Sequence, residues 1–295
     1  MNAIIMAAGT SSRFVPLSYE KPKGLLKVKG EILIERQIRQ LQEACVYDII
    51  VVVGYMAEQF AYLKEKCGVK LVMNEDYNRY NNTSSIIRVI DELEDTYICS
   101  SDNYFPNNVF LEHSDFSYYS ALYAEGETKE YCLTTDNNDY ITEVKVGGHD
   151  AWYMVGHAFF TKEFSEKFRF IMKKEYVSDE TRQGYWEDVY RRYIDELPPM
   201  KIHRYGAHGI EEFDSLDELR QFDVEYVNHT GSRIMQNICK VLKCEEKDIC
   251  NITIPKDDVT KTSFKFICRK DNKMYICRCS GPNIQINEDL LIAKT

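Results

Sequence analysis

Five consecutive β-branched residues, Ile49-Ile50-Val51-Val52-Val53, are the feature that most restricts the fold of this chain. A run without polar alternation predicts a strand buried on both faces, as in a parallel sheet covered by helices. Ala3–Ala8 is a second apolar run, and Ile32–Ala44 between the two carries apolar side chains at helical spacing. This order of strand, helix and strand predicts an α/β fold with a doubly wound, mostly parallel sheet.

The same alternation continues through about the first hundred residues. It predicts a helical stretch around Phe60–Leu63, a strand at Val69–Met73, a helix at Ser84–Leu93 and a strand at Thr96–Ser100. Ligands of doubly wound folds bind at the carboxyl ends of the strands. We therefore expect functional residues directly after these strands.

After Tyr104 the pattern changes to an antiparallel insertion, of the kind that forms the wall of a pocket for a second substrate. Turn residues of the Asn/Asp and Gly types separate four expected strands, Tyr118–Tyr123, Glu130–Thr135, Ile141–Val146 and Trp152–Phe160. Two helices are then expected, at Phe164–Lys174 and Trp186–Leu197.

We predict a domain boundary after residue 228. Residues 1–228 would form the α/β domain, which a short helix within Glu211–Tyr226 closes. Residues 229–295 would form a small α+β appendage, with a helix at Gly231–Leu242 and three short strands after it. The appendage is too small to hold a catalytic domain of its own.

Composition disfavours several classes of function. The formal net charge is −10, and an acidic surface disfavours nucleic acid because phosphate-backbone affinity needs clustered Lys and Arg. No apolar run reaches the roughly 20 residues that span a bilayer, and the N-terminus lacks the layout of a secretory signal, so we expect a cytoplasmic protein without a membrane partner. The ten cysteines are scattered, which indicates reduced thiols, and Cys277-x-Cys279 has no second pair that would indicate zinc.

A Gly/Ser turn at Gly9–Arg13 follows the first expected strand. The backbone amides of such a turn can hold a triphosphate. Pro22 restricts the backbone before Lys23, and we expect Lys23 to point toward the same anion as Arg13. The alternative is that both are solvated surface cations.

Two aspartates are candidate ligands of Mg²⁺, which binds a few carboxylates together with phosphate oxygens and water. Asp102 lies in Ser100-Ser101-Asp102-Asn103, directly after an expected strand. Asp214 lies in Glu212-Phe213-Asp214-Ser215, before an expected helix. For Asp214 the alternative is a helix N-cap, which the residues themselves favour.

Polar and aromatic residues suggest further contacts. Tyr80 and Asn82 lie in the polar segment Tyr77–Ser85, whose asparagines can bind a base or ribose, or can cap a helix that starts near Ser84. Aromatic rings that face a cavity attract a cationic head group, although such rings are more often part of a core. The candidates in the insertion are Tyr131, Trp152, Tyr153, Tyr185 and Trp186.

Taken together, residues 1–226 resemble the sugar-phosphate nucleotidyltransferase superfamily, and more narrowly the bacterial CTP:phosphocholine cytidylyltransferases. The superfamily signature is matched by Gly9, Arg13, Pro16 and Pro22-Lys23. The cytidylyltransferase-like features are Val53-Gly54-Tyr55, Tyr80-Asn81-Asn82, Asp102-Asn103-Tyr104, Tyr185-Trp186 and Asp214-Ser215.

The resemblance implies that a phosphate or phosphonate oxygen of a small phosphorylated amino-alcohol or aminophosphonate attacks the α-phosphorus of CTP and releases pyrophosphate. It implies Mg²⁺ on Asp102 and Asp214, and Lys23 and Arg13 on the phosphates. It further implies a cytidine site and a head-group pocket. The residues implied for the cytidine site are Ala8, Gly9, Thr10, Tyr80, Asn82 and Ser100, and those for the pocket are Tyr131, Trp152, Tyr185, Trp186 and Glu187.

Two departures from the family pattern stand out. Ser11 replaces the second glycine of the turn, which is tolerable if its backbone angle is ordinary. Tyr131 replaces a tryptophan of the choline pocket, which weakens the indication of a trimethylammonium group. It leaves room for 2-aminoethylphosphonate, whose primary amine would prefer carboxylates such as Glu187 or Asp188. Phosphocholine remains the first interpretation.

The appendage resembles the beginning of a choline-kinase-like N-lobe, without the lobe that carries kinase catalysis. The matching residues are Ile254-Pro255-Lys256, Thr262-Ser263-Phe264 and Tyr275-Ile276-Cys277-Arg278. We interpret it as the remnant of a bifunctional fusion or as a packing or dimerisation module, which would allow a homodimer, and we expect no kinase activity.

Two other functions remain open. A sugar-1-phosphate nucleotidyltransferase would share Gly9, Arg13 and Lys23, but its pocket would need polar groups where this sequence has aromatic ones. A silent nucleotide-binding scaffold would have no need of both Asp102 and Asp214.

Overall fold

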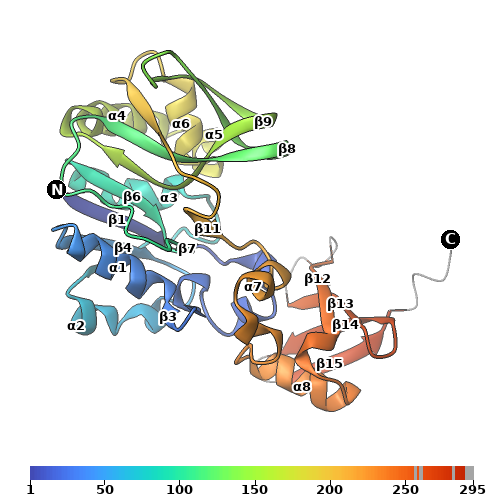
Figure 1. Ribbon diagram of the computed structural model, residues 1–295. Helices are drawn as coiled ribbons and strands as arrows, with labels where there is room; N and C mark the ends of the chain where they lie inside the picture. The colour runs from blue at the N-terminus through green and yellow to red at the C-terminus, as the bar shows by residue number, and fades with distance from the viewer. Residues whose placement is uncertain (256–257, 259–261, 281–282, 290–295) are drawn as a thin grey trace. The chain divides into compact units, whose positions relative to one another are not determined.

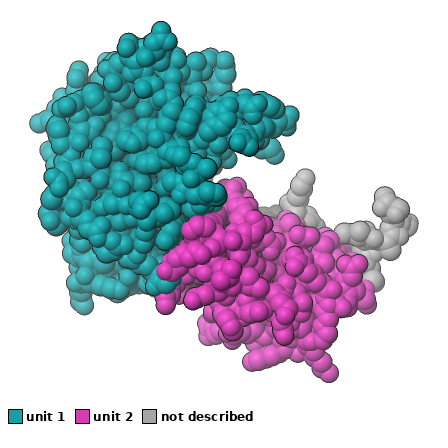
Figure 2. Space-filling model, viewed as in Figure 1, with its two compact units in different colours: residues 1–9, 30–212 teal, residues 10–29, 213–295 magenta. Residues whose placement is uncertain are grey.

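The computed structural model describes residues 1–255, 258, 262–280 and 283–289, so Lys256 of the kinase-like motif lies outside the described residues. The chain forms two compact units (Figure 2). Unit 1 comprises residues 1–9 and 30–212, and unit 2 comprises residues 10–29 and 213–295. No helix in the described part of the chain is long and apolar enough to cross a membrane.

A seven-stranded sheet forms the centre of unit 1, in the order β10-β8-β9-β6-β1-β4-β5. Strands β6, β1, β4 and β5 are parallel, which confirms the predicted α/β class. The sheet strands are β1 (Asn2–Ala7), β4 (Asp48–Val53), β5 (Lys70–Met73), β6 (Thr96–Ser100), β8 (Ser117–Thr135), β9 (Ile141–Phe160) and β10 (Met200–Arg204), and short strands are β3 (Glu31–Ile32), β7 (Asn103–Tyr104) and β11 (Glu211–Glu212).

Helices cover both faces of this sheet, α1 and α2 on one side and α4 and α6 on the other (Figure 1). Ile4 and Ile98 of the sheet join one buried cluster with Phe164, Phe168 and Trp186 of the second side. The helices of unit 1 are α1 (Leu33–Glu43), α2 (Leu63–Cys67), α3 (Thr83–Ile86), α4 (Lys162–Glu175), α5 (Asp179–Gln183) and α6 (Trp186–Arg192), with 3-10 turns η4 (Ala57–Phe60) and η5 (Ile87–Glu92).

The insertion differs from the prediction because the four expected strands form two long ones, β8 and β9, which pair as an antiparallel ribbon. Gly126 and Gly147 have positive φ angles of 78° and 80°. They lie where the pairing register shifts, between Ala124 and Glu127 and beside Gly148. The glycines therefore mark irregularities within continuous strands, which glycine accommodates without strain, and not the ends of strands.

Unit 2 joins an early segment of the chain to its last third. Its early elements are the 3-10 turns η1 (Ser12–Phe14), η2 (Leu17–Tyr19) and η3 (Lys23–Leu25), and strand β2 (Lys27–Val28). The later elements are α7 (Leu216–Phe222), η6 (Val224–Val227), α8 (Arg233–Leu242), η7 (Glu246–Asp248), β12 (Ile249–Thr253), β13 (Ser263–Cys268), β14 (Lys273–Ser280) and β15 (Asn283–Glu288). Strands β12 to β15 form an antiparallel sheet in chain order.

The compact units do not divide at the predicted boundary after residue 228. The segment 10–29 and residues 213–228 belong with the C-terminal elements. The prediction assumed domains that are continuous in sequence, whereas contacts between distant segments define the units. Tyr19, for example, donates a hydrogen bond from its hydroxyl to the Ser263 carbonyl at 3.2 Å.

Candidate active site

The topology of unit 1 fixes where a ligand should bind. The chain runs outward from β1 to β4 and β5 and then returns to β6 on the other side of β1. In open parallel sheets, ligands bind at the carboxyl ends of the strands where the order reverses in this way. Ala8 and Gly9 follow β1, and Ser100 pairs with Met6 at the end of β6. The predicted strand-end residues are therefore neighbours at the switch point.

The turn after β1 begins with Ala8 and Gly9. Ala8 is packed against other residues of unit 1, whereas there is free space beside Gly9. A methyl group at Gly54 would lie 2.7 Å from Cβ of Tyr77 and 3.0 Å from Cβ of Ala8, so only glycine fits there. The amide of Tyr55 donates to the Ala8 carbonyl at 3.1 Å. At Gly9, by contrast, no heavy atom among the described residues comes within 4 Å of an added methyl group. A ligand can therefore approach the backbone at Gly9 closely.

Asp102 lies in the tight turn between β6 and β7, as the sequence predicted. The side chain of Gln37, in α1, brackets this turn, because its Nε2 donates to the carbonyl of Ser100 at 2.8 Å and to that of Asn103 at 3.0 Å. Gln37 is fully buried. The helix thus fixes the backbone on both sides of the half-buried Asp102.

Sequence reasoning missed Gln37, although a signal was present. The residue lies on the apolar face of α1, with Ile34 and Ile38. A buried carboxamide needs hydrogen-bond partners. Glutamines on the buried stripe of an amphipathic helix, here Gln37 and Gln40, therefore indicate structural contacts to a loop.

The segment around Tyr80 and Asn82 precedes α3 and makes contacts that the sequence did not disclose. Asn82 occupies the N-cap position without a side-chain capping bond. Its Oδ1 accepts from the Trp186 amide at 2.8 Å, and its Nδ2 donates to Glu187 Oε2 at 3.2 Å. The capping alternative does not apply, and the carboxamide belongs to a cluster with the start of α6.

That cluster, which we call the head-group cluster, consists of Asn82, Tyr131, Tyr185, Glu187 and Asp188. The rings of Tyr131 and Tyr185 meet edge to face, with centroids 6.3 Å apart. The Tyr131 hydroxyl donates to Asp188 Oδ1 at 3.0 Å. The structure thus brings two aromatic rings and two adjacent carboxylates together.

The pKa of the Glu187 carboxyl group is raised above its usual value. Burial raises its pKa to about 7, while hydrogen bonds from Asn82 and from the Tyr119 hydroxyl, at 3.1 Å, act in the opposite direction. Perturbed carboxyl groups of this kind are concentrated at functional sites. Tyr119, on β8, was not predicted, because nothing in the sequence indicates that it faces α6.

The rings of the two tryptophans have other neighbours than the cluster residues. Trp186 is 1% exposed and stacks on Tyr119, within the core of unit 1. Trp152 is partly buried, and its ring meets Tyr123 at 5.4 Å and the guanidinium of Arg204 at 5.4 Å. Tyr131 and Tyr185 are therefore the predicted pocket rings that lie beside Glu187 and Asp188.

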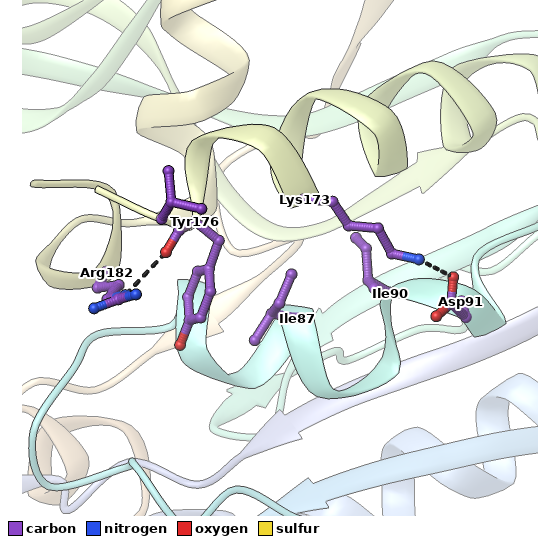
Figure 3. A pocket seen from close by; sticks show the side chains of 7 residues that line it. Ile87, Ile90, Asp91, Lys173, Tyr176 and Arg182 are labelled. Atoms are coloured by element: carbon purple, nitrogen blue, oxygen red, sulfur yellow. Dashed lines mark hydrogen bonds and ion pairs between the residues drawn. The ribbon is translucent and has the colours of Figure 1, made fainter. Parts of the chain in front are cut away.

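A shallow hollow of about 360 Å³ lies next to the Tyr80 segment, between η5 and α4 (Figure 3). Its rim carries the Lys173–Asp91 ion pair and Arg182, whose Nε donates to the Tyr176 carbonyl at 2.9 Å. The Arg182 carbonyl accepts from the Asn81 amide at 3.1 Å. The backbone of Arg182 therefore helps to hold the Tyr80 segment in place.

Unit 2 contains Arg13 and Lys23, the residues of the superfamily signature that are expected to bind phosphate. Arg13 Nη1 and Asp214 Oδ2 form an ion pair at 2.7 Å, with exposed side-chain fractions of 77% and 43%. The N-cap of α7 is Ser215, whose side chain accepts from the Glu218 amide. Asp214 is therefore not the helix cap, and its carboxylate is instead paired with Arg13.

The backbone of the turn differs from the expectation at Ser11, which has φ 49° and ψ 42°. This left-handed conformation is the one that glycine adopts without strain. The condition of an ordinary backbone angle is therefore not met. Thr10, the preceding residue, opens the segment that belongs to unit 2.

Lys23 is not a solvated surface cation, because the residue is only 6% exposed. Its Nζ lies 5.7 Å from the centroid of the Phe14 ring, directly after Arg13 in the chain. Pro22 before it has an extended backbone, and the Leu26 amide closes the turn on the Lys23 carbonyl at 3.0 Å. The structure thus places Lys23 beside the Arg13 turn.

Comparisons with known proteins place the chain in a family. Residues 3–113 match the family described as MobA-like NTP transferase domain. A choline-phosphate cytidylyltransferase from Streptococcus pneumoniae is 35% identical over 223 residues, which cover 76% of this chain and 97% of that protein. A 2-aminoethylphosphonate cytidylyltransferase from Lancefieldella rimae is 38% identical over 230 residues, which cover 77% and 93%.

The fold is shared as well. The solved structure of CTP:phosphocholine cytidylyltransferase from Streptococcus pneumoniae matches with a TM-score of 0.72 at 36% identity, covering 75% of this chain and 96% of that one. Two relatives above 30% identity are thus matched over more than nine-tenths of their length. This chain belongs to the nucleotidyltransferase family that contains the choline-phosphate and 2-aminoethylphosphonate cytidylyltransferases.

Proposed function

We propose that this enzyme joins CTP to phosphocholine, forming CDP-choline and releasing pyrophosphate. The observation that carries the proposal is the head-group cluster, in which the Tyr131 and Tyr185 rings lie beside the carboxylates of Glu187 and Asp188. Aromatic faces and carboxylates both attract a cationic head group. Unit 1 also contains the turn after β1, which lies where the strand order reverses, and ligands of such sheets bind at this point.

The cytidine would lie along the backbone of unit 1 after β1 and β6. Ala8 and Gly9 offer an open backbone surface, and Ser100 ends the neighbouring strand. Tyr80 adds an aromatic face, with Arg79 and Arg182 at 5.4 and 5.8 Å from its ring centroid. Contacts to main-chain groups can select cytosine without a dedicated charged side chain.

In the reaction, an oxygen of the substrate phosphate attacks the α-phosphorus of CTP, and pyrophosphate leaves. The attacking oxygen is already an anion, so no protein nucleophile or general base is needed. Catalysis then consists of positioning and of charge stabilisation. Lys23 neutralises charge on the transferred and leaving phosphates, and Arg13 holds the β- and γ-phosphates.

Asp102 and Asp214 would hold Mg²⁺, and their oxygen donors fit it. No group of three or more His, Cys, Asp or Glu side chains suited to a metal occurs among the described residues. Mg²⁺ is commonly bound by one or two carboxylates plus phosphates, so two acids suffice. When bound, it would act as a Lewis acid on the phosphate oxygens. The Arg13–Asp214 pair must open for both partners to take these roles.

A second candidate substrate is 2-aminoethylphosphonate. The specific observation in its favour is the pair of adjacent carboxylates, since a primary ammonium can donate hydrogen bonds to Glu187 and Asp188 while a trimethylammonium cannot. A sugar phosphate is less suited to the cluster, because it offers no cation to the rings of Tyr131 and Tyr185.

The C-terminal helix and four-stranded sheet are compatible with the proposed likeness to a kinase N-lobe.

The test is pyrophosphate release in the presence of Mg²⁺, with CTP and UTP each crossed against phosphocholine, 2-aminoethylphosphonate and glucose-1-phosphate. The proposal expects turnover with CTP and phosphocholine. Turnover with 2-aminoethylphosphonate alone would select the second candidate. Turnover only with glucose-1-phosphate, or in no combination, would contradict both.

A further inference from the structure

The segment that carries Arg13 and Lys23 shares one compact unit with the C-terminal part of the chain (Figure 2). It consists mainly of short 3-10 turns, which provide few hydrogen bonds of their own. Its conformation must therefore depend on contacts with other parts of unit 2. We call residues 229–295 the C-terminal module.

Helix α8 of the module binds Glu20, three residues before Lys23. The Ser232 hydroxyl donates to one oxygen of the Glu20 carboxylate, and the Arg233 amide donates to the other at 3.1 Å. Ser232 is also the N-cap of α8, because its Oγ accepts from the Met235 amide at 3.1 Å. One buried serine thus caps the helix and attaches it to the segment.

The four-stranded sheet of the module contacts Tyr19, the residue directly before Glu20. Tyr19 donates to the Ser263 carbonyl at 3.2 Å, and its ring lies 6.1 Å from that of Phe264. Phe264 is fully buried. Tyr19 is therefore attached both by a hydrogen bond and by ring packing.

The other end of the segment is fixed as well, by residues just before the module. The Lys29 amide donates to Asp223 Oδ2 at 2.6 Å, and the Tyr226 hydroxyl donates to the Lys27 carbonyl at 3.1 Å. Lys23 lies between these two attachments. A turn held at both ends retains little freedom, and each attachment then restricts the direction of Lys23.

We infer that the C-terminal module positions Lys23 for phosphoryl transfer, through Glu20 and Tyr19 as positioning residues. This inference rests on the proposed role of Lys23. About a quarter of this chain lies outside the alignment with the Streptococcus pneumoniae relative, which is itself almost fully covered. The contacts of Ser232 and Ser263 with Glu20 and Tyr19 are the basis for assigning the module a supporting role.

Two substitutions at Ser232 separate attachment from helix capping. Ser232→Thr keeps both the cap and the donor to Glu20. Ser232→Asp keeps a capping acceptor but places a carboxylate against that of Glu20. In the full-length protein we expect Ser232→Asp to lower kcat about 10-fold with the KM for phosphocholine unchanged, since small misplacements of reacting groups have large effects. Ser232→Thr should retain normal kcat.

Hydrogen–deuterium exchange of the same proteins gives a readout that does not need activity. We expect Ser232→Asp to speed amide exchange in residues 20–26 about 10-fold, without a change in α4 of unit 1. Wild-type rates in this segment would overturn the inference, and so would faster exchange with an unchanged kcat. An inactive wild type would refute the proposed function, while the exchange data would still decide whether the module holds the segment.

A second pair of variants covers the case in which Ser232→Asp does not fold. Tyr19→Phe removes the hydroxyl that reaches Ser263, and Tyr275→Phe removes one that reaches Asp271 within the module. We expect faster exchange in residues 20–26 and a lower kcat for Tyr19→Phe only. Equal effects of the two variants would indicate general loosening of the module and would contradict a positioning role.

Discussion

Unit 1 and unit 2 support their functional residues in different ways. In unit 1, Ala8, Gly9 and Asp102 follow the parallel strands β1 and β6 of one buried sheet. In unit 2, Arg13 and Lys23 lie in 3-10 turns that contacts with residues 200 to 250 positions later hold in place. A sheet fixes its strand ends through many shared hydrogen bonds, whereas a turn depends on each of a few contacts.

This difference has consequences for mutation. Changes in unit 1 should act on the chemistry of a single side chain, because the backbone around it is rigid. Changes around the turns of unit 2 should also act at a distance, through the attachments of the segment.

Asp102→Asn should lower kcat about 10³-fold while leaving thermal unfolding almost unchanged, because it removes charge but keeps the shape of the turn. Losses of this order are typical when one electrostatic contact to the reacting group is removed. Steady-state pyrophosphate release measures the effect. Asp91→Asn, at an exposed ion pair with Lys173, is the matched control and should keep normal activity. Near-normal kcat in Asp102→Asn would refute the metal assignment.

Lys23→Met should lower kcat about 10²-fold, since the buried ammonium is proposed to neutralise the transferred phosphate. Lys21→Met is the control, because Lys21 is exposed and lies only two residues earlier in the same segment. The ratio of the two kcat values isolates the contribution of the buried cation. Equal losses would mean that the segment provides only a general positive charge, and the contrast between the units would then weaken.

The acidity of Glu187 predicts a pH-dependent affinity for an amine. Its pKa is raised to about 7, so the carboxyl is mostly protonated at pH 6 and mostly ionised at pH 8. The KM for 2-aminoethylphosphonate should therefore fall as the pH rises through 7, about 10-fold overall, because only the ionised form attracts the ammonium.

Glu187→Gln should remove that trend while the ionisation of the substrate itself stays the same. Glu180→Gln, at an exposed carboxylate on α5, should behave like the wild type. A KM profile that is identical in wild type and Glu187→Gln would remove Glu187 from the head-group site.

Ser11→Gly should stabilise the protein by about 0.5 kcal/mol, because it relieves the left-handed backbone at φ 49° and this gain exceeds the added freedom of the unfolded chain. Ser12→Gly, one residue later and inside η1, should instead destabilise it by about 0.5–1 kcal/mol. Denaturant unfolding of both variants measures the difference. Destabilisation of equal size in both would show that the turn imposes no strain at Ser11.

The fold of unit 1 could be predicted because its strands are continuous apolar runs. Ile49–Val53 lies within β4, and Thr96–Ser100 is β6 as predicted. Strand β10, with the sequence MKIHR, was missed because its alternation is short and mostly polar. The joining of four expected strands into β8 and β9 was also missed, since the same glycines serve turns and bulges.

The positions of candidate-site residues could be predicted where the residues directly follow a strand. Asp102 needed only the position of β6. The partners of Asn82 and the burial of Trp186 depend on the packing of α6 against the sheet, which no local pattern encodes. The attachment of Glu20 to Ser232 spans more than 200 residues of sequence. Contacts between residues so far apart in the sequence leave no signal in a single sequence.

We propose that this enzyme makes a CDP-linked amino-alcohol, and a competition experiment between the two candidate substrates tests the proposal. The wild-type enzyme would receive CTP, Mg²⁺ and equal concentrations of phosphocholine and 2-aminoethylphosphonate, and mass spectrometry would quantify the two nucleotide products. We expect CDP-choline as the main product. A mixture dominated by the cytidylylated aminophosphonate, or the absence of both products, would contradict it.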